Sequence, residues 1–376
     1  MEEWKECKLG DIAHFTTGKL NSNAAEDNGI YPFFTCSPET YRINSYAFDT
    51  NAILLAGNNA EGNFNIKRYS GKFNAYQRTY VITVDDYTDL TFLFYALKLC
   101  LAEFKHISQG TATKFLTTKI LNNFVINLPP LPTQQKIATI LSSLDDKIEL
   151  NNKINNNLEQ QAQAIFKSWF VDFEPFGGEM PETWRIGKLS EIADYLNGLA
   201  MQKFRPIENE IGLPVLKIKE LRQGSCDENS ELCSPTSIKK EFIIHDGDVI
   251  FSWSGSLLVD IWCGGKCGLN QHLFKVTSKQ YDKWFYYLWT KHHLDRFIFL
   301  AADKATTMGH IKREELDKAE VVIPSEIDMK RISSVMQPII DMIINNKIEN
   351  IRLSKTRDEL LPKLMNGDLS VDEVRI

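Results

Sequence analysis

An internal repeat constrains the fold of this chain more than any other feature of its sequence. The segment Trp4–Ala13 returns as Trp184–Ala193, with Trp, Leu, Ile and Ala at the same spacing. Two later segments return in the same order: Gln77–Arg78 as Gln271–His272, and Val125–Pro129 as Glu320–Pro324. Because the order is kept, two copies of one unit explain the chain better than two unrelated domains.

Each copy divides by composition into a mixed segment and a helical segment. Residues 1–130 alternate short apolar runs with Gly, Asn and Pro, which is typical of a compact α/β unit. Between Pro132 and Pro175 the chain has neither Pro nor Gly, and apolar residues recur every three or four positions. This period predicts a single long helix over 133–170 with a heptad seam.

A similar helical segment follows residue 324 in the second copy. Its apolar residues, Val335 and Ile351 among them, follow mostly helical steps, and Pro338 should either kink the helix or mark its start. We expect four segments: a globular unit over 1–130, a spacer helix within 131–176, a globular unit over 177–324, and a second helix with a C-terminal tail over 325–376. We expect the helices to pair antiparallel through the seam residues Ile137, Leu141, Leu144, Ile148, Asn151, Leu158, Ile165, Ile332, Ile339, Ile343 and Ile348.

Asparagine clusters lie near the middle of both helical segments. Asn151 and Asn152 lie in the first, and Asn345 and Asn346 lie in the second. Antiparallel helices would bring these clusters together, and a buried Asn at a seam fixes register at a cost in stability. The alternative is that these asparagines are simply exposed, and the sequence leaves both possibilities open.

Three motifs make the chain similar to a known protein family. They are the opening Trp4–Ala13, the segment Ser108–Thr111 that leads to Lys119 and Ile120, and the run Leu128–Ile137. With their duplication, the chain resembles the specificity subunit of type I restriction-modification enzymes over essentially its whole length. The resemblance implies an α/β (α+β) fold: target-recognition domains in a pseudo-two-fold repeat, joined by two long antiparallel coiled-coil helices.

The same resemblance implies a function and a set of partners. Each globular unit would recognise one half of a split sequence in double-stranded DNA, while the helices set the spacing and dock two methyltransferase subunits. Restriction subunits would join through the complex. Methylation and cleavage, with S-adenosylmethionine, ATP and Mg, would belong to the partner subunits. This chain would then be non-catalytic and would bind no cofactor or metal itself.

The net charge limits how DNA could be held. The chain has 43 Lys and Arg against 49 Asp and Glu, a formal charge of -6, which excludes histone-like binding by a global positive field. Residues 61–80, 104–127 and 261–281 are nevertheless locally positive. Cationic and hydroxyl side chains there would contact phosphates, and amide or guanidinium groups beside them would contact base edges.

The candidate DNA-binding residues follow from these windows. They are Asn58, Asn59, Lys67, Arg68, Lys72, Gln77, Arg78, Thr111, Thr113 and Lys114 in the first copy, and Ser254, Ser256, Lys266, Gln271, His272, Thr306, Thr307, His310 and Lys312 in the second. Gly57 and Gly255, in loops at similar places in the two copies, would let the backbone approach a groove. The competing interpretation is local structure, since Asn beside Gly is typical of a turn and Gln77 could pair locally.

Other activities lack their usual sequence signatures. There is no Gly-x-x-x-x-Gly-Lys-Ser/Thr phosphate loop, no Gly-x-Gly-x-x-Gly, and no Asn or Asp before Pro-Pro as an adenine methyltransferase would have. A metal-dependent nuclease could use Glu103 and Lys105 or Glu6 and Lys8, but such pairs arise often by chance. A coiled-coil adaptor that binds peptides is the main alternative function.

Three further features bear on localisation, metals and stacking. The polar N-terminus and the lack of a long apolar run lead us to expect a cytoplasmic protein without a membrane span. We expect the seven cysteines to be free thiols, because their number is odd and they are spread thinly over the chain. A structural zinc is not expected, because only Cys263 and Cys267 have the spacing of a zinc knuckle. The aromatic run between Trp284 and Trp289 could stack on bases, but we expect it in the core.

Overall fold

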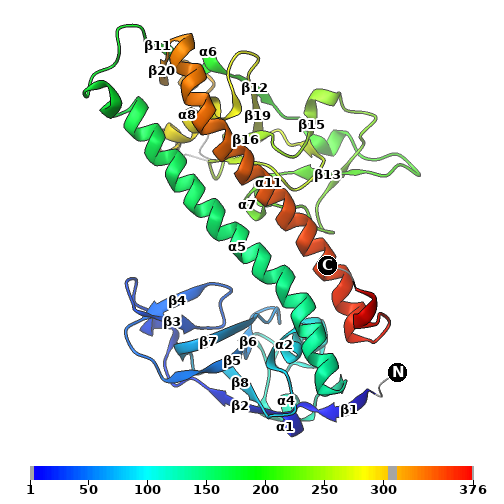
Figure 1. The fold of residues 1–376 in the computed structure, drawn as a ribbon. Coiled ribbons are helices and arrows are strands. Elements are labelled where there is room, and N and C mark those ends of the chain that lie inside the picture. The colour runs from blue at the N-terminus through cyan, green and yellow to red at the C-terminus, as the bar shows by residue number, and fades with distance from the viewer. Residues whose placement is uncertain (1–3, 304–310, 375–376) are drawn as a thin grey trace. The chain divides into compact units, whose positions relative to one another are not determined.

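The computed structural model describes residues 4–303 and 311–374, which belong to two compact units (Figure 1). Unit 1 comprises residues 1–146 and 354–376, and unit 2 comprises residues 147–353. Each unit therefore holds one globular part together with a portion of both long helices. The four segments expected from composition place boundaries at the ends of the helices instead, and those boundaries stay a prediction.

The two longest helices of the described residues have 40 residues each: α5 (Leu131–Phe170) and α11 (Glu326–Met365). The single long helix predicted over 133–170 is confirmed. Pro338 does not mark the start of the second helix, because α11 begins at Glu326 and continues past the proline. Pro338 has no backbone N–H, so the helix lacks one hydrogen bond there. The other backbone hydrogen bonds of this long helix are sufficient to continue it past the proline.

The globular part of unit 1 is a six-stranded sheet with helices on one side. Its elements are β1 (Lys5–Lys8), α1 (Leu9–Ile12), β2 (Ala13–Thr17), η1 (Ser22–Ala24), β3 (Tyr31–Phe34), β4 (Thr40–Ile43), β5 (Phe48–Ala56), β6 (Asn58–Asn59), β7 (Ile66–Ala75), β8 (Thr79–Val84), α2 (Leu90–Leu99), α3 (Leu101–Ile107), β9 (Lys114–Phe115), α4 (Thr118–Asn123) and β10 (Val125–Leu128), with η5 (Val371–Glu373) from the C-terminal part. The strand order is β2-β8-β5-β7-β3-β4, and only β3 and β7 pair in parallel.

Strand β5 lies at the centre of this sheet and is buried on both faces. Ile53 and Leu55 pack with Leu93 of α2 and Phe104 of α3, whereas Leu54 faces a second cluster on the other side. A continuous apolar run is what a strand covered on both faces requires, and residues 52–56 supply it.

Unit 2 contains two four-stranded sheets in its globular part. Its elements are η2 (Glu174–Phe176), β11 (Arg185–Lys188), α6 (Leu189–Ile192), β12 (Asp194–Asn197), η3 (Met201–Lys203), β13 (Leu213–Leu216), α7 (Ile218–Gln223), β14 (Leu232–Cys233), η4 (Lys240–Phe242), β15 (Ile243–Ile244), β16 (Val249–Ser252), β17 (Leu258–Ile261), β18 (Cys267–Leu269), β19 (Leu273–Thr277), α8 (Lys283–His292), α9 (Leu294–Asp303), α10 (Glu314–Asp317) and β20 (Glu320–Ile323). The strand orders are β12-β19-β16-β17 and β14-β13-β18-β15.

The sequence repeat corresponds to a repeat of structure. Strand β1 pairs antiparallel with β10, as β11 does with β20. The N–H of Leu9 donates to the carbonyl of Phe124 at 2.9 Å, and that of Leu189 donates to the carbonyl of Ala319 at 2.8 Å. The order β2-β8-β5 in unit 1 is matched by β12-β19-β16 in unit 2. The expected fold class, mixed α/β units in a repeat with two long helices, is confirmed.

Hydrogen bonds in both units show that the two helices run antiparallel. In unit 2, Asn151 donates to Asn350 at 2.9 Å, and Asn346 donates to Asn155 at 2.9 Å. In unit 1, Arg357 donates to Asp145 at 2.6 Å. Residues further along α5 are thus bonded to residues that come earlier in α11, which is the pattern of antiparallel helices.

The predicted seam residues are all at least partly buried. Ile137, Leu141, Leu144, Asn151, Ile332 and Ile343 are buried, and Ile148, Leu158, Ile165, Ile339 and Ile348 are half-buried. Val335 and Ile351, which follow the same helical steps but were not among the predicted seam residues, are exposed, at 42% and 38%. The buried stripe of α11 instead runs through Met336 and Ile340, because α11 packs on the core of unit 2 as well as on α5.

The expectation that the aromatic run of α8 is core is confirmed. Trp284 and Phe285 are fully buried, and Trp289 is 3% exposed. Among the described residues, no helix is long and apolar enough to cross a membrane.

Candidate nucleic-acid interface

Three segments of unit 1 meet at Gly57, the residue that follows β5. Its N–H donates to the carbonyl of Arg78 at 2.8 Å, and its carbonyl accepts from the N–H of Leu116 at 2.8 Å. Strand β6 then pairs Asn58 with Phe115 and Asn59 with Lys114. A Cβ at Gly57 would lie 2.5 Å from the Arg78 carbonyl oxygen, so glycine is what allows this close approach.

We call the surface around this junction face 1, defined by Asn58, Asn59, Gln77, Arg78 and the segment Thr111–Lys114. Gln77 and Arg78 are exposed in the turn between β7 and β8. They line a hollow of about 310 Å³ with Gly57. A hollow of about 560 Å³ is lined by Asn58, Asn59 and Thr113. Seven of the ten candidate residues of the first copy therefore belong to face 1.

The amide side chains of face 1 are partly engaged by neighbours. The Cys36 thiol donates to Asn58 Oδ1 at 2.8 Å, and Gln77 Nε2 donates to Asn21 Oδ1 at 2.9 Å. Asn59 Oδ1 accepts from the backbone N–H groups of Glu61 and Asn63, at 2.9 and 3.0 Å. Asn59 thus forms the local turn that was its competing interpretation, whereas the contact of Asn58 with Cys36 uses its Oδ1 atom.

The segment that carries the candidate phosphate contacts is a tight loop beside β6. Gln109 and Phe115 exchange two backbone hydrogen bonds, at 3.0 and 2.8 Å. Gly110 allows the loop to close, because its φ is +96° and a Cβ there would lie 2.1 Å from the Thr113 carbonyl oxygen. Thr111 and Thr113 are exposed at the tip. Hydroxyl groups and backbone N–H groups in such a loop can contact phosphates.

The three cations of β7 are spread along the strand rather than gathered on face 1. Lys67 donates to the Glu39 carbonyl at 2.7 Å, and burial lowers its pKa although Glu39 opposes this. Arg68 donates to Thr91 of α2 on the opposite side of the sheet. Lys72 lies 4.7 Å from the centre of the Tyr46 ring. Lys67 reaches the β3–β4 connection, which also lines the larger hollow, whereas Arg68 points toward α2.

Unit 2 repeats the junction with different side chains. The N–H of Trp253 donates to the His272 carbonyl at 3.4 Å, and the Trp253 carbonyl accepts from the N–H of Ile311 at 3.1 Å. The N–H of Gln271 donates to the Leu199 carbonyl at 2.8 Å, as that of Gln77 does to the Leu20 carbonyl at 2.9 Å. The counterpart of Gly57 is therefore Trp253, and Gly255 lies two residues further along the loop.

We call the corresponding surface face 2, defined by Ser254, Gly255, Ser256, Gln271 and His272. Ser254 is buried, and its Oγ lies 2.9 Å from His272 Nδ1. Gln271 Nε2 lies 3.3 Å from the other ring nitrogen of His272. The carbonyl of Ser256 accepts from Ser252 Oγ at 2.8 Å. These contacts hold the candidate base-contacting groups of the second copy in one network.

The remaining candidates of the second copy lie elsewhere. Lys266 is exposed, in the loop after β17, at the end of the β16–β17 hairpin away from Ser254. Lys312 is exposed directly after Ile311. Thr306, Thr307 and His310 lie outside the described residues.

The alternative catalytic and metal sites lack the contacts they need. Glu103 and Lys105 lie exposed on α3 rather than on neighbouring strands, and Lys105 donates to Asn63 at 2.9 Å. Glu6 faces Asn127 across β1 and β10, with no acidic residue on β10. Cys263 and Cys267, the pair with zinc-like spacing, lie in different hydrophobic clusters. Among the described residues, no group of three metal-ligating side chains comes together.

The sequence is similar to a family model and to curated proteins that all describe type I restriction specificity subunits. The family model described as the type I restriction modification DNA specificity domain matches residues 1–160 and again 181–353. The MjaIX type I specificity subunit of Methanocaldococcus jannaschii is 32% identical over 305 residues, which cover 75% of this chain and 70% of that protein. The EcoDI specificity subunit of Escherichia coli is 38% identical over 185 residues, which cover 49% of this chain and 40% of that protein.

A solved structure shares the fold. The crystal structure of a type I restriction-modification S subunit from M. genitalium superposes with a TM-score of 0.63 at 16% identity. The match covers 97% of this chain and 96% of the other.

Proposed function

Since the chain belongs to the family of type I restriction-modification DNA specificity subunits, we propose that each of its two globular parts recognises one half of a bipartite target in double-stranded DNA. Face 1 would read one half and face 2 the other. The chain would act without catalytic groups of its own, on cellular DNA in the cytoplasm.

The repetition of one junction with different side chains carries this proposal. The backbone hydrogen bonds around Gly57 recur around Trp253, whereas the exposed pair Gln77–Arg78 is replaced by Gln271–His272. Two domains that recognise different DNA half-sites require different hydrogen-bonding side chains, which the same backbone arrangement in both copies can hold. Amide and guanidinium groups pair with base edges, and the neighbouring hydroxyl and cationic groups contact phosphates.

We further propose that α5 and α11 set the spacing of the two half-sites and dock the partner subunits. A continuous helix has a fixed rise of about 1.5 Å per residue, so its length determines a spacing. The partners would be two methyltransferase subunits, with restriction subunits joining through the complex. S-adenosylmethionine, ATP and Mg would be bound by those partners.

The salt dependence of DNA binding tests this proposal against a peptide-binding adaptor. The measurement is the affinity of the complex with its cognate methyltransferase subunits for a duplex, over a series of salt concentrations. Phosphate contacts predict a log-linear loss of at least about tenfold between about 50 and 200 mM salt. An Arg78→Gln variant should bind more weakly than an Arg352→Gln variant, in which an exposed arginine of α11 is replaced. Absence of duplex binding, or binding that is independent of salt, would contradict the proposal.

A further inference from the structure

The connection between the first two strands that pair as a hairpin in each sheet, β3–β4 in unit 1 and β13–β14 in unit 2, differs between the two copies. In unit 1, strands β3 and β4 are joined by the short turn 35–39, which lines the larger hollow of face 1. In unit 2, the corresponding strands β13 and β14 are joined by residues 217–231, which include α7. We propose that Arg222 of α7 contacts a guanine in the half-site of unit 2 and so determines specificity. This inference rests on the proposed function and names a residue of the same surface.

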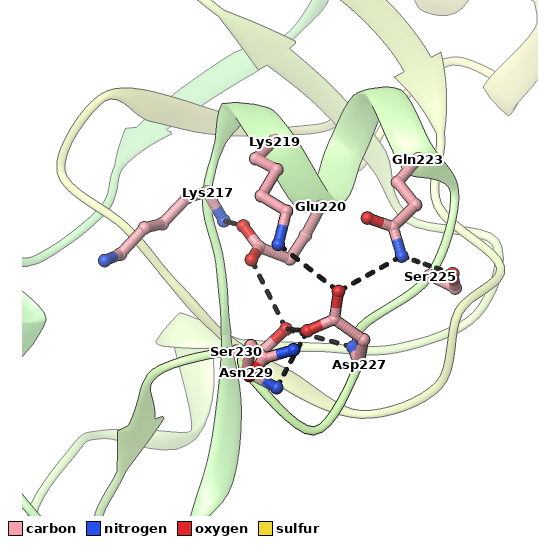
Figure 2. Close-up of polar contacts among 8 residues, drawn as sticks. All are labelled: Lys217, Lys219, Glu220, Gln223, Ser225, Asp227, Asn229 and Ser230. Carbon is pink, nitrogen blue, oxygen red and sulfur yellow. Dashed lines mark hydrogen bonds and ion pairs between the residues drawn. The ribbon is translucent and has the colours of Figure 1, made fainter. Parts of the chain in front are cut away.

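A polar network fixes α7 to the loop that follows it (Figure 2). Glu220 is buried, and its carboxylate accepts from the Lys217 N–H at 3.2 Å and from Ser230 Oγ at 3.3 Å. Asp227 accepts from Asn229 N–H at 2.9 Å and from Lys219 Nζ at 3.2 Å. These bonds join both ends of the connection, so α7 is held in one orientation.

Apolar packing holds the other side of α7. Leu221 is 2% exposed and packs with Leu216 and Trp262 in one cluster. The helix ends at Gly224, whose φ of +75° gives the left-handed conformation of a helix C-terminus. A buried Leu221 places its neighbour Arg222 on the solvent side, where Arg222 is exposed.

Arg222 differs from the other cations of this connection because its charge is not neutralised. Lys219 pairs with Asp227 at 3.2 Å, and Lys217 pairs with Glu231. Within residues 4–303 and 311–374, the Arg222 guanidinium makes no ion pair or hydrogen bond. Two of the three cations therefore serve the local structure, and the third is available to a ligand.

The position of Arg222 connects it to face 2. It lines a hollow of about 420 Å³ together with Gly255 and Ser256 of face 2 and with Ile298 and Ala301 of α9. A Cβ at Gly255 would lie 3.6 Å from Ile218, which shows that α7 is adjacent to this loop. A guanidinium on a fixed helix beside hydroxyl and backbone groups suits guanine, whose O6 and N7 accept two parallel hydrogen bonds.

The test is the methylation specificity of Arg222 variants in the complex with the cognate methyltransferase subunits. Arg222→Gln should relax one position in one half of the target, with about tenfold less discrimination for guanine there. Arg222→Lys should also lose discrimination for guanine, because an ammonium group keeps the charge but cannot form the bidentate hydrogen bonds of a guanidinium group. Lys240→Gln is the control: it removes one positive charge from an exposed residue of the same unit, outside α7 and its polar network, and should leave the motif unchanged.

The outcomes separate this inference from the proposed function. An altered half that differs from the half altered by Arg78→Gln would support Arg222 as a specificity residue of unit 2. An unchanged motif in Arg222→Gln, or a uniform loss of methylation at all sites, would overturn the inference while leaving the proposed function intact. A wild-type complex that methylates no split motif would overturn both.

Discussion

At the scale of single residues, His293 shows how burial sets the charge of a side chain in unit 2. Its ring centre lies 6.0 Å from those of Trp289 and Phe297, and its Nε2 donates to the Glu320 carbonyl at 2.8 Å. Burial lowers its pKa to about 4, although the bond to Glu320 opposes this shift. The folded unit therefore holds the ring in its neutral form.

This shift predicts that unit 2 loses stability in mild acid. An unfolded histidine binds a proton near pH 6.5, whereas the folded one does so only near pH 4. The contribution of His293 is thus present above about pH 6.5 and is lost as the pH falls toward 4. Unfolding by urea across this pH range measures it. His293→Gln should flatten the profile, and the exposed-site control His106→Gln should not; equal profiles for wild type and His293→Gln would contradict the account.

Residue chemistry was only partly predictable from the sequence. The candidates Asn58, Gln77 and Arg78 are brought together because they flank strands whose ends meet, and strand ends can be recognised by pattern. Cys36, which holds Asn58, and Arg222 were missed. Neither lies in a motif, and each acts through contacts between segments that are distant in sequence. Lys67 and Arg68 contact different neighbours because successive side chains of a strand point to opposite faces of the sheet. A count of charges along the sequence does not contain this information.

At the scale of elements, buried asparagines fix how α5 pairs with α11. Asn155 is 5% exposed, donates to the Ile343 carbonyl at 3.3 Å and accepts from Asn346 at 2.9 Å. Asn151 donates to both Glu349 and Asn350. Polar groups buried between helices favour the one register in which they find partners. Of the two possibilities left open by the sequence, burial is right for Asn151, whereas Asn152 and Asn345 are exposed.

Replacing Asn155 should destabilise the helix pair of unit 2. Asn155→Ala leaves the Asn346 amide without its acceptor, which costs about 1–3 kcal/mol. The exposed neighbour Asn156 gives the control, since Asn156→Ala should change stability by less than about 0.5 kcal/mol. Urea unfolding followed by tryptophan fluorescence reports mainly on unit 2, because Trp4 is the one tryptophan of the seven outside it. Equal stabilities of the two variants would contradict the assignment.

The elements were more predictable than the residues. The absence of Pro and Gly over a long apolar period predicted α5 nearly to its ends, since a helix of this length has no competing structure. The phase of α11 was less predictable. Its buried stripe shifts to Met336 and Ile340 because a helix that packs on two neighbours has a wider apolar face than a simple seam.

At the scale of the whole molecule, the chain is two variations on one structural unit. The motifs that recur in sequence form the β1–β10 and β11–β20 ladders. In each copy, the two paired strands are the first and the last strand of the globular part. The segments that differ, such as the β3–β4 turn and the α7 connection, border faces 1 and 2. This division of a shared frame from variable surfaces would be the physical basis for the two half-site specificities that we propose.

The most direct test is to express the chain with its cognate methyltransferase subunit and to sequence the methylated adenines of the host DNA. The account predicts a split motif with a fixed spacer. Exchange of residues 181–325 for those of a relative should then change one half of the motif and leave the other half and the spacer unchanged. Methylation at a continuous motif, or a change in both halves on this exchange, would contradict the claim that each unit reads its own half.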